Sequence, residues 1–245
     1  SNVAIGKDAL DSNTTASNNV AIGVDALQAN TTGAQNVAVG KDALLLNTTA
    51  DNNTAVGYLA LEDSTGAANT ALGSQAAKNV TSGNLNVAVG VEALASNTVG
   101  DRNIAMGFQS LLTFNPTSNA DTYNVAIGHV ALKALTTGTL NTAIGGQSLE
   151  SATTGSSNTA LGYGSLNANT TGTQNTAVGT SALDANTTAN NNTAIGHASL
   201  GANTTGTENV AIGTFALDAN TTANLNTAVG YNSLTSNTTG SNNTA

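Results

Sequence analysis

Residues 19–35 read NVAIGVDALQANTTGAQ, and residues 36–52 read NVAVGKDALLLNTTADN. The two segments align without a gap. The motif that opens them, Asn-(Thr/Val/Ile)-Ala-(Val/Ile/Leu/Met)-Gly, recurs along the whole chain, and a fifteenth copy begins at Asn243. Twelve of the fourteen intervals between copies are 17 residues, and the other two are 16 and 21. A fixed short period of this kind is typical of a solenoid, in which each repeat forms one coil.

Each repeat is numbered here from its first Asn as position 1. Position 3 is Ala in every copy, position 5 is Gly, and position 8 is Ala or Ser. Position 9 is Leu except at Ala77, and positions 12 to 15 usually read Asn-Thr-Thr-(Gly/Ala). Helix is disfavoured because Gly, Asn and Thr are weak helix formers. The β-branched residues of positions 1 to 5 predict a strand that ends at Gly, where the chain turns sharply and any Cβ is predicted to clash. Positions 7 to 10 predict a second strand, and Asn-Thr-Thr-Gly predicts a turn.

Two strands and two turns per repeat predict an all-β fold, a parallel β-roll or β-solenoid of about fourteen 17-residue coils. The repeats form a single continuous region over 1–245, with one irregular 21-residue repeat at 103–123. The chain starts one residue before a motif and stops inside one. We therefore expect a section of a longer protein, or a unit that stacks end to end.

Stacked coils place identical residues above one another. The aliphatic residues of position 4 and the Leu of position 9 are predicted to form two facing columns inside the coil. The Asn of position 1 is predicted to form a hydrogen-bonded ladder, as stacked amides do in cross-β structures. This structural Asn ladder comprises Asn2, Asn19, Asn36, Asn53, Asn69, Asn86, Asn103, Asn124, Asn141, Asn158, Asn175, Asn192, Asn209 and Asn226.

Alternate residues of a strand point to opposite faces, so position 3 should point outward if position 4 points inward. An invariant Ala on an outer face indicates a second buried surface, where sister chains pack too closely for more than a methyl group. The predicted oligomer face comprises Ala4, Ala21, Ala38, Ala55, Ala71, Ala88, Ala105, Ala126, Ala143, Ala160, Ala177, Ala194, Ala211 and Ala228. The expected partners are therefore copies of the same chain, and symmetry about a fibre axis makes three the natural number.

Composition excludes several classes of function. The chain of 245 residues and 24.0 kDa carries five Lys and Arg against 14 Asp and Glu, for a formal net charge of −9. Such a surface cannot neutralise a phosphate backbone, which argues against nucleic acid as a partner. The absence of Cys excludes disulfides, thiolate metal sites and cysteine nucleophiles. No apolar run approaches the roughly 18 residues that cross a bilayer.

No catalytic residue, cofactor or metal site is predicted. The two histidines, His129 and His197, lie four repeats apart, roughly 19 Å along the axis, and no paired carboxylate motif is present. Asp8, Asp25 and Asp42 occupy position 7 of three consecutive repeats. A cation bridging them is one interpretation, and a solvated face screened by the adjacent lysines is the favoured one.

Two segments are candidate binding surfaces. Position 6, directly after the Gly, varies freely and collects aromatic rings that could stack on sugars or proteins, although drift at an exposed position is the simpler explanation. Its candidate residues are Tyr58, Phe108, His129, Tyr163, His197 and Tyr231. The 21-residue repeat holds an insertion that should bulge outward and could bind a partner, or could reflect tolerated length variation. Its candidate residues are Phe114, Pro116 and Tyr123.

The Asn-Thr-Thr segments also contain Asn-x-Thr acceptor triplets for N-glycosylation. The favoured interpretation is that this segment is the turn the coil requires. An ice-binding Thr array is disfavoured because acidic and bulky residues interrupt it.

The motif Asn-Val-Ala-Ile-Gly at 2–6, 19–23, 124–128 and 209–213, followed by Ala-Leu, resembles the head repeats of trimeric autotransporter adhesins (YadA-like heads). Similar repeats occur in phage tail-fibre-like proteins and in bacterial surface fibres. The resemblance covers the whole chain, although the 17-residue period is longer than the family's usual repeat. It implies a left-handed β-roll, a homotrimer and an adhesive role at the cell surface or outside the cell, with a host-surface protein or glycan as the expected partner. The alternatives are a phage tail-fibre shaft and a subunit of an end-to-end filament.

Overall fold

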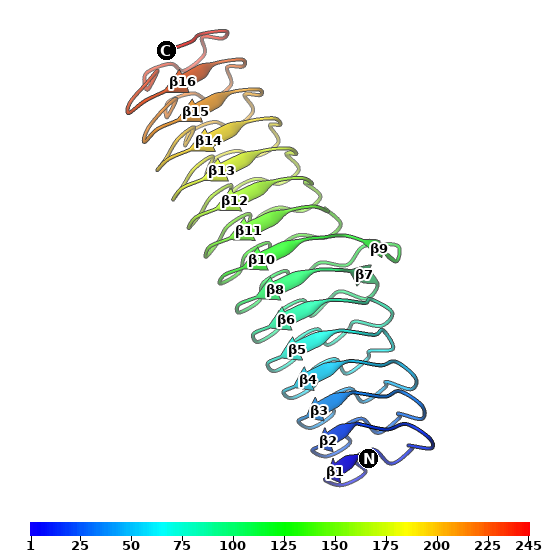
Figure 1. Cartoon of the computed structure of the whole chain (residues 1–245). Helices are drawn as coiled ribbons and strands as arrows, with labels where there is room; N and C mark the ends of the chain where they lie inside the picture. Colours follow the sequence, from blue (N-terminus) through cyan, green and yellow to red (C-terminus); the bar gives the residue numbers. More distant parts are fainter. The chain divides into compact units, whose positions relative to one another are not determined.

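The computed structural model describes residues 1–245 and contains only short β-strands joined by turns. No helix is present that could cross a membrane. The chain forms two compact units, Ser1–Tyr123 and Asn124–Ala245. Each unit is a parallel β-solenoid in which every repeat contributes one three-residue strand (Figure 1). The predicted all-β solenoid with 17-residue spacing is confirmed.

In the first unit, seven strands pair in chain order and in parallel, so that the same repeat position stands opposite itself in every pair. These strands are β1 (Val3–Ile5), β2 (Val20–Ile22), β3 (Val37–Val39), β4 (Thr54–Val56), β5 (Thr70–Leu72), β6 (Val87–Val89) and β8 (Ile104–Met106). A separate two-stranded parallel pair joins β7 (Gly100–Asp101) to β9 (Ala120–Asp121).

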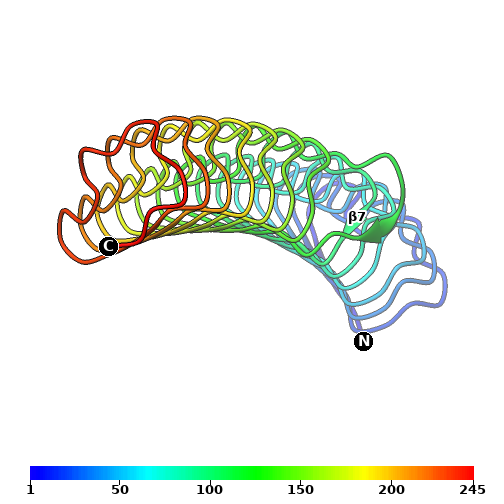
Figure 2. The same cartoon turned by 90° about the horizontal axis from the view of Figure 1, so that it is seen from above.

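In the second unit, seven further strands pair in the same way. They are β10 (Val125–Ile127), β11 (Thr142–Ile144), β12 (Thr159–Leu161), β13 (Thr176–Val178), β14 (Thr193–Ile195), β15 (Val210–Ile212) and β16 (Thr227–Val229). Within each unit, successive coils follow nearly the same outline when seen from above (Figure 2). Equivalent residues therefore form columns.

The Gly of position 5 ends each strand in a conformation that only glycine adopts readily. Its φ lies at +133° in Gly145 and +136° in Gly162. A Cβ added at Gly145 would lie 2.5 Å from the carbonyl oxygen of Gly162 in the next coil. The clash predicted from the sequence at this position is therefore present, and it arises between neighbouring coils.

The Asn ladder of position 1 is confirmed. The backbone N–H of Asn36 donates to Oδ1 of Asn19 at 2.8 Å, and Nδ2 of Asn36 donates to the carbonyl oxygen of Ala50 at 2.8 Å. The same pair of bonds recurs in most coils, for example at Asn175. Because these amides are buried and hydrogen-bonded, they supply polar contacts inside the coil without an unsatisfied donor.

The prediction that the Ala of position 3 faces outward is wrong. These side chains point into the coil and are completely buried, apart from Ala4 in the first coil. The buried members are Ala21, Ala38, Ala55, Ala71, Ala88, Ala105, Ala126, Ala143, Ala160, Ala177, Ala194, Ala211 and Ala228. A 17-residue coil encloses little volume, and the Asn and Leu columns already occupy most of it. Only a methyl group fits beside them, so the larger residues of positions 2 and 4 point outward. The predicted interior column of position-4 aliphatic residues is therefore also wrong.

The second predicted strand, over positions 7 to 10, is also wrong. The chain turns here, and residues of positions 7 and 9 have positive φ, as in Asp25 (58°) and Leu27 (54°). Consecutive residues at positions 8 and 9, such as Ala26 and Leu27, are both fully buried, which an extended strand does not allow. Hydrogen bonds between coils hold this conformation, because the N–H of Leu27 donates to the carbonyl oxygen of Ala43 at 2.9 Å. The predicted interior Leu column is confirmed.

A second buried Asn ladder occupies position 12 and was not predicted. Nδ2 of Asn186 donates to Oδ1 of Asn169 at 2.8 Å and to the carbonyl oxygen of Ala189 at 3.2 Å. Beside it, the Thr of position 13 donates from its hydroxyl to the next coil, as Thr170 does to the carbonyl oxygen of Thr187 at 3.0 Å. The Asn-Thr-Thr segment is therefore a structural turn of the coil.

A third set of hydrogen bonds between coils occurs at position 16. The N–H of Thr173 donates to Oδ1 of Asn190 at 2.6 Å, and the N–H of Thr207 donates to Oδ1 of Asn224 at 2.7 Å. In the first unit, the N–H of Ala34 donates to Oδ1 of Asp51 at 2.7 Å. A side chain able to accept a hydrogen bond therefore follows each of these backbone donors in the next coil.

Candidate functional surfaces

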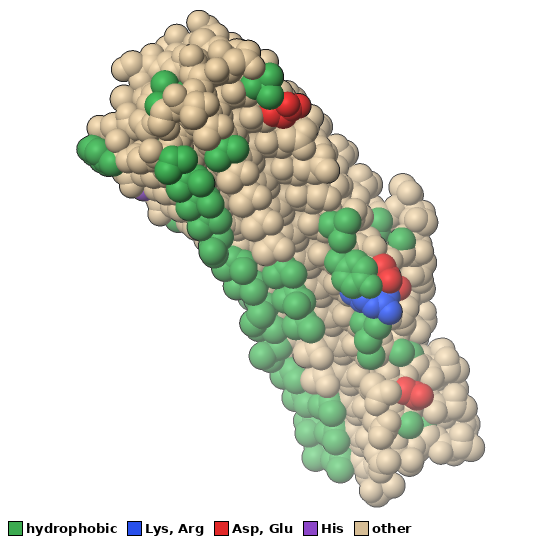
Figure 3. Space-filling view, turned by 45° about the horizontal axis from the view of Figure 1, so that its top comes forward, with side chains coloured by type: hydrophobic (Ala, Val, Ile, Leu, Met, Phe, Trp, Pro, Cys, Tyr) green, Lys and Arg blue, Asp and Glu red, His purple; other side chains and the backbone are tan.

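The outer strand face, defined as the side chains of positions 2 and 4, is an exposed apolar surface in each unit. Position 4 carries only Ile, Val, Leu or Met, and its exposed fractions include 49% at Leu72, 45% at Leu161 and 39% at Ile195. Position 2 carries only Val, Ile or Thr. Hydrophobic side chains follow the strands of each unit in Figure 3. No charged residue interrupts either column.

The position-6 column lies directly beyond the Gly that ends each strand, and its aromatic residues are exposed as predicted. Tyr58, Phe108, Tyr163 and Tyr231 are 49%, 46%, 59% and 73% exposed, and His129 and His197 are also exposed. The ring of His197 meets that of Phe215 edge to face, with centroids 5.2 Å apart. Tyr58 lies beneath the ammonium group of Lys41, 5.7 Å from the ring centroid.

Two of the acidic residues of position 7, Asp8 and Asp42, pair with lysines on the same coil. Lys7 Nζ lies 3.2 Å from a carboxylate oxygen of Asp8, and Lys41 forms an ion pair with Asp42. The hydrogen bond from Lys7 to Asp8, aided by the charges of Asp8 and Asp25, raises the pKa of Lys7. No group of three or more metal-ligating side chains gathers anywhere in the structure. These contacts therefore agree with the interpretation of position 7 as a solvated face whose carboxylates are screened by adjacent lysines.

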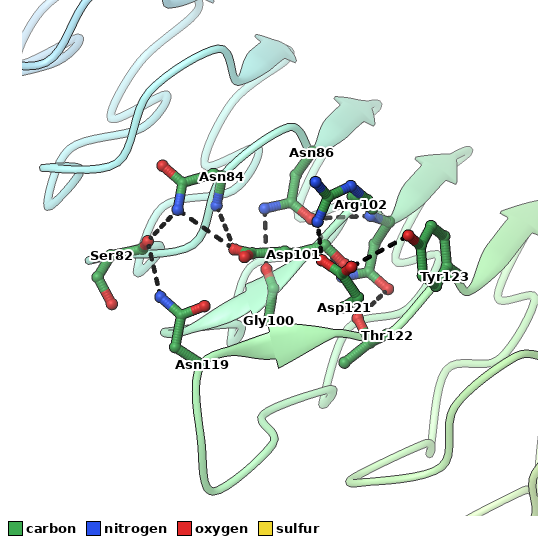
Figure 4. Close-up of polar contacts among 11 residues, drawn as sticks. Ser82, Asn84, Asn86, Gly100, Asp101, Arg102, Asn119, Asp121, Thr122 and Tyr123 are labelled. Carbon is green, nitrogen blue, oxygen red and sulfur yellow. Dashed lines mark hydrogen bonds and ion pairs between the residues drawn. The ribbon is translucent and has the colours of Figure 1, made fainter.

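The insertion in the 21-residue repeat builds a polar cluster on the first unit (Figure 4). Arg102 forms an ion pair with Asp121, and its guanidinium lies 5.9 Å from the ring centroid of Tyr123. The Tyr123 hydroxyl donates to Oδ2 of Asp121 at 3.1 Å. Asp101 accepts the N–H of Asn84 at 2.6 Å. The β7–β9 pair fixes the backbone under these side chains.

The candidate residues of this insertion differ in their positions. Tyr123 is 47% exposed, as a binding residue would be, but Phe114 and Pro116 are buried, so their predicted placement in an exposed loop is wrong. Phe114 occupies position 12, where most coils have the buried Asn, and fills that volume with its ring. The chain bulges only after Pro116, which shows that the extra residues follow the position-12 side chain.

The glycosylation triplets lie in a position that the fold buries. Asn30, Asn169, Asn186 and Asn203 are completely buried, and each donates its Nδ2 to the carbonyl oxygen of position 15 in its own coil. A glycan would have to replace one of these internal hydrogen bonds. The interpretation of Asn-Thr-Thr as a structural turn therefore agrees with the structure.

The structure has no pocket, so the candidate sites are open surfaces. The chain matches no protein-family model, and the search of curated proteins finds no relative. The arguments for function therefore depend on the outer strand face, the position-6 column and the insertion. The outer strand face was missed because the alternation of positions 2, 3 and 4 does not itself say which face is inside.

Proposed function

We propose that this chain is a structural and adhesive segment of an extracellular fibre, without enzymatic activity, and that copies associate through the outer strand face. The continuous position-4 column of exposed aliphatic side chains carries the proposal. Exposed apolar surfaces of this extent mark interaction sites in soluble proteins. The face is also uncharged along its whole length in each unit, so no desolvated charge opposes burial against another apolar surface.

A second copy is the occupant that fits this face best. The column repeats once per coil, so a partner must offer apolar groups at the same spacing to cover it. Another copy of the solenoid has that spacing, because it also presents one position-4 side chain per coil. Burying half of an aliphatic side chain contributes on the order of 1 kcal/mol, and seven coils per unit supply several such contributions along one face. The resemblance to trimeric adhesin heads supports three copies.

The correction at position 3 changes the proposed contact between the copies. The methyl column is inside the coil and is unavailable to a partner. The side chains of positions 2 and 4 take its place, and they supply larger apolar groups. The association proposed from the sequence therefore keeps its stoichiometry but uses the opposite face of the strand.

Molar mass in solution tests the proposal. The wild-type chain should sediment as a multiple of 24.0 kDa, with three copies expected. A triple variant of the outer strand face, Ile144→Thr, Leu161→Thr and Ile195→Thr, should dissociate to single chains, because Thr suits a strand but removes the apolar contact. A matched control changes Val24, Leu46 and Val91 to Thr and should keep the wild-type mass, because these exposed residues lie outside the outer strand face and have no positive φ. A wild-type chain that stays folded and monomeric contradicts the proposal.

A further inference from the structure

In the Asn124–Ala245 unit, aromatic rings occupy position 6 in every second coil. The intervening coils carry small residues there, so the rings stand separated along one column. The alternating aromatic residues, here called the aromatic track, are His129, Tyr163, His197 and Tyr231, and the small residues between them are Gly146, Thr180 and Thr214. All four rings are exposed. The first unit has no such alternation, because Lys7, Val24, Lys41 and Tyr58 follow one another there.

Backbone hydrogen bonds fix the spacing of the track. The N–H of Ser181 donates to the carbonyl oxygen of Tyr163 at 3.0 Å, and the N–H of Ala198 donates to that of Thr180 at 3.0 Å. Neighbouring strands are about 4.8 Å apart, so rings two coils apart recur about every 9.6 Å. Over the six coil steps from His129 to Tyr231, the track extends for about 29 Å.

Local contacts hold two of the rings, Tyr163 and His197, in place. A Cβ on Gly146 would lie only 3.5 Å from the Tyr163 ring, so this ring rests beside the bare backbone of the preceding coil. The edge-to-face contact with Phe215 orients His197. Binding to rings that are already ordered loses little conformational entropy.

The position-7 column beside the track contains no ionisable residue in this unit. Position 7 of this unit is formed by Val130, Gln147, Gly164, Ser181, Ala198, Phe215 and Asn232. In the first unit the same column contains four carboxylates, at Asp8, Asp25, Asp42 and Glu92. The track therefore suits an uncharged ligand with flat apolar faces and hydrogen-bonding groups at its edges.

We propose that the aromatic track binds a linear, uncharged β-1,4-linked polysaccharide lying along the column of coils. In such a chain each sugar is turned by half a rotation from the last, so every second sugar presents the same face. The length of this disaccharide repeat nearly equals two coils. Alternate sugars would stack their C–H faces on the rings, and their hydroxyls would meet Gln147 and Ser181. The inference gives the adhesive role a ligand class, and it depends on one unit's surface rather than on self-association.

Calorimetric titration with defined oligosaccharides tests the register. Cellohexaose and chitohexaose distinguish glucose from N-acetylglucosamine, and maltohexaose supplies the same sugar with an α-linkage that coils the chain. We expect binding of at least one β-1,4-linked hexasaccharide, tighter than that of its disaccharide, and none of maltohexaose. Failure of both β-linked ligands, or equal binding of maltohexaose, overturns the proposal.

Tyrosine variants test the location. Tyr163→Ala should weaken hexasaccharide binding about tenfold, as loss of an exposed aromatic anchor does. Tyr58→Ala removes the same residue type from the same position of the other unit and should leave binding unchanged. An equal loss in both variants contradicts the proposal.

Molar mass separates this proposal from the previous one. If Tyr163→Ala dissociates the oligomer, the column is a contact between copies and the track is not a sugar site. If the outer-strand-face variant is monomeric and still binds the hexasaccharide with wild-type affinity, the track is a sugar site regardless of the oligomeric state.

Discussion

Nδ2 of Asn47 donates a 3.0 Å hydrogen bond to Oδ1 of Asn30 in the preceding coil, while its own buried Oδ1 accepts none. The next coil is the 16-residue repeat, and it carries Ser64 at position 12. The shorter Ser64 hydroxyl points to the carbonyl oxygen of Gly66, 3.4 Å away. The position-12 ladder is therefore interrupted over two coils, at Ser64 and Val80, and the buried acceptor of Asn47 has no partner.

Restoring an amide in place of Ser64 should stabilise the protein. Ser64→Asn supplies a donor for Oδ1 of Asn47, and satisfying a buried acceptor contributes about 1 kcal/mol. Chemical denaturation followed by circular dichroism should show a higher free energy of unfolding. Ser64→Ala is the control, because it supplies no donor and should give no increase. A gain of equal size in both variants would mean that the ladder is not its cause.

The adjacent residues Gly145 and Gly146 should respond differently to substitution by Ala. Gly145→Ala places a Cβ 2.5 Å from the Gly162 oxygen at a φ of +133°, so we expect a loss of about 3 kcal/mol or failure to fold. Gly146→Ala meets only the Tyr163 ring at 3.5 Å, an ordinary contact, and should change stability by less than about 1 kcal/mol. Thermal melting of the two variants measures their losses of stability. Similar losses would contradict the conclusion that position 5 excludes a Cβ while position 6 tolerates one.

The two phenylalanines of the 21-residue repeat should also behave differently. Phe114 is completely buried, so Phe114→Ala should cost about 3–5 kcal/mol. Phe108 is 46% exposed, so Phe108→Ala should cost less than about 1 kcal/mol. Equilibrium unfolding in urea measures both. If Phe114→Ala is tolerated, the ring does not replace the position-12 amide as part of the core.

Asp184 should make stability depend on pH. Burial raises the pKa of this carboxyl above 3.8, so the folded chain binds its proton more tightly than the unfolded chain does. The contribution of Asp184 to stability therefore falls as pH rises from 3.8 through the folded-state pKa, and stays lower above it. Asp184→Asn should raise the free energy of unfolding at pH 7 by less than about 1 kcal/mol and have no such effect at pH 3. The melting temperatures of the variant and the wild type at the two pH values measure this difference. A gain that is the same at both pH values would contradict this.

The repeat period identified the fold, because a ladder of identical residues requires coils in register. The same reasoning found the Asn ladder of position 1 and the clash at position 5. It did not identify which face of the strand points into the coil. Alternation correctly placed position 3 opposite positions 2 and 4. Positions 3 and 4 are apolar in every copy, and position 2 mixes Val and Ile with Thr, so the predicted hydrophobicity did not distinguish the two faces. Side-chain size decides, since Ala21 fits beside Asn19 and Leu27 in a narrow coil and Ile22 does not.

The left-handed Leu residues could not be predicted from local preference. Leu rarely adopts positive φ, yet Leu27, Leu44 and Leu94 do so in successive or nearby coils, at 54°, 52° and 55°. Hydrogen bonds between coils and burial of the side chain stabilise the conformation, and both arise only when coils stack. The exposure of the position-6 aromatic residues was predicted from the sequence. Their alternation with small residues in the second unit was recognised as a surface feature only after the structure divided the chain into two units.

The Thr-to-Asn contacts of position 16, Thr173 to Asn190 and Thr207 to Asn224, recur every two coils. Losing one 17-residue copy between Thr173 and Asn190 would leave a backbone donor facing the wrong neighbour. Copying or losing 34 residues in this part of the chain would preserve the Thr-to-Asn contacts, and would also preserve the alternation of rings at Tyr163, His197 and Tyr231. Recombination in two-coil steps can therefore change the length of the protein while the remaining surface stays the same.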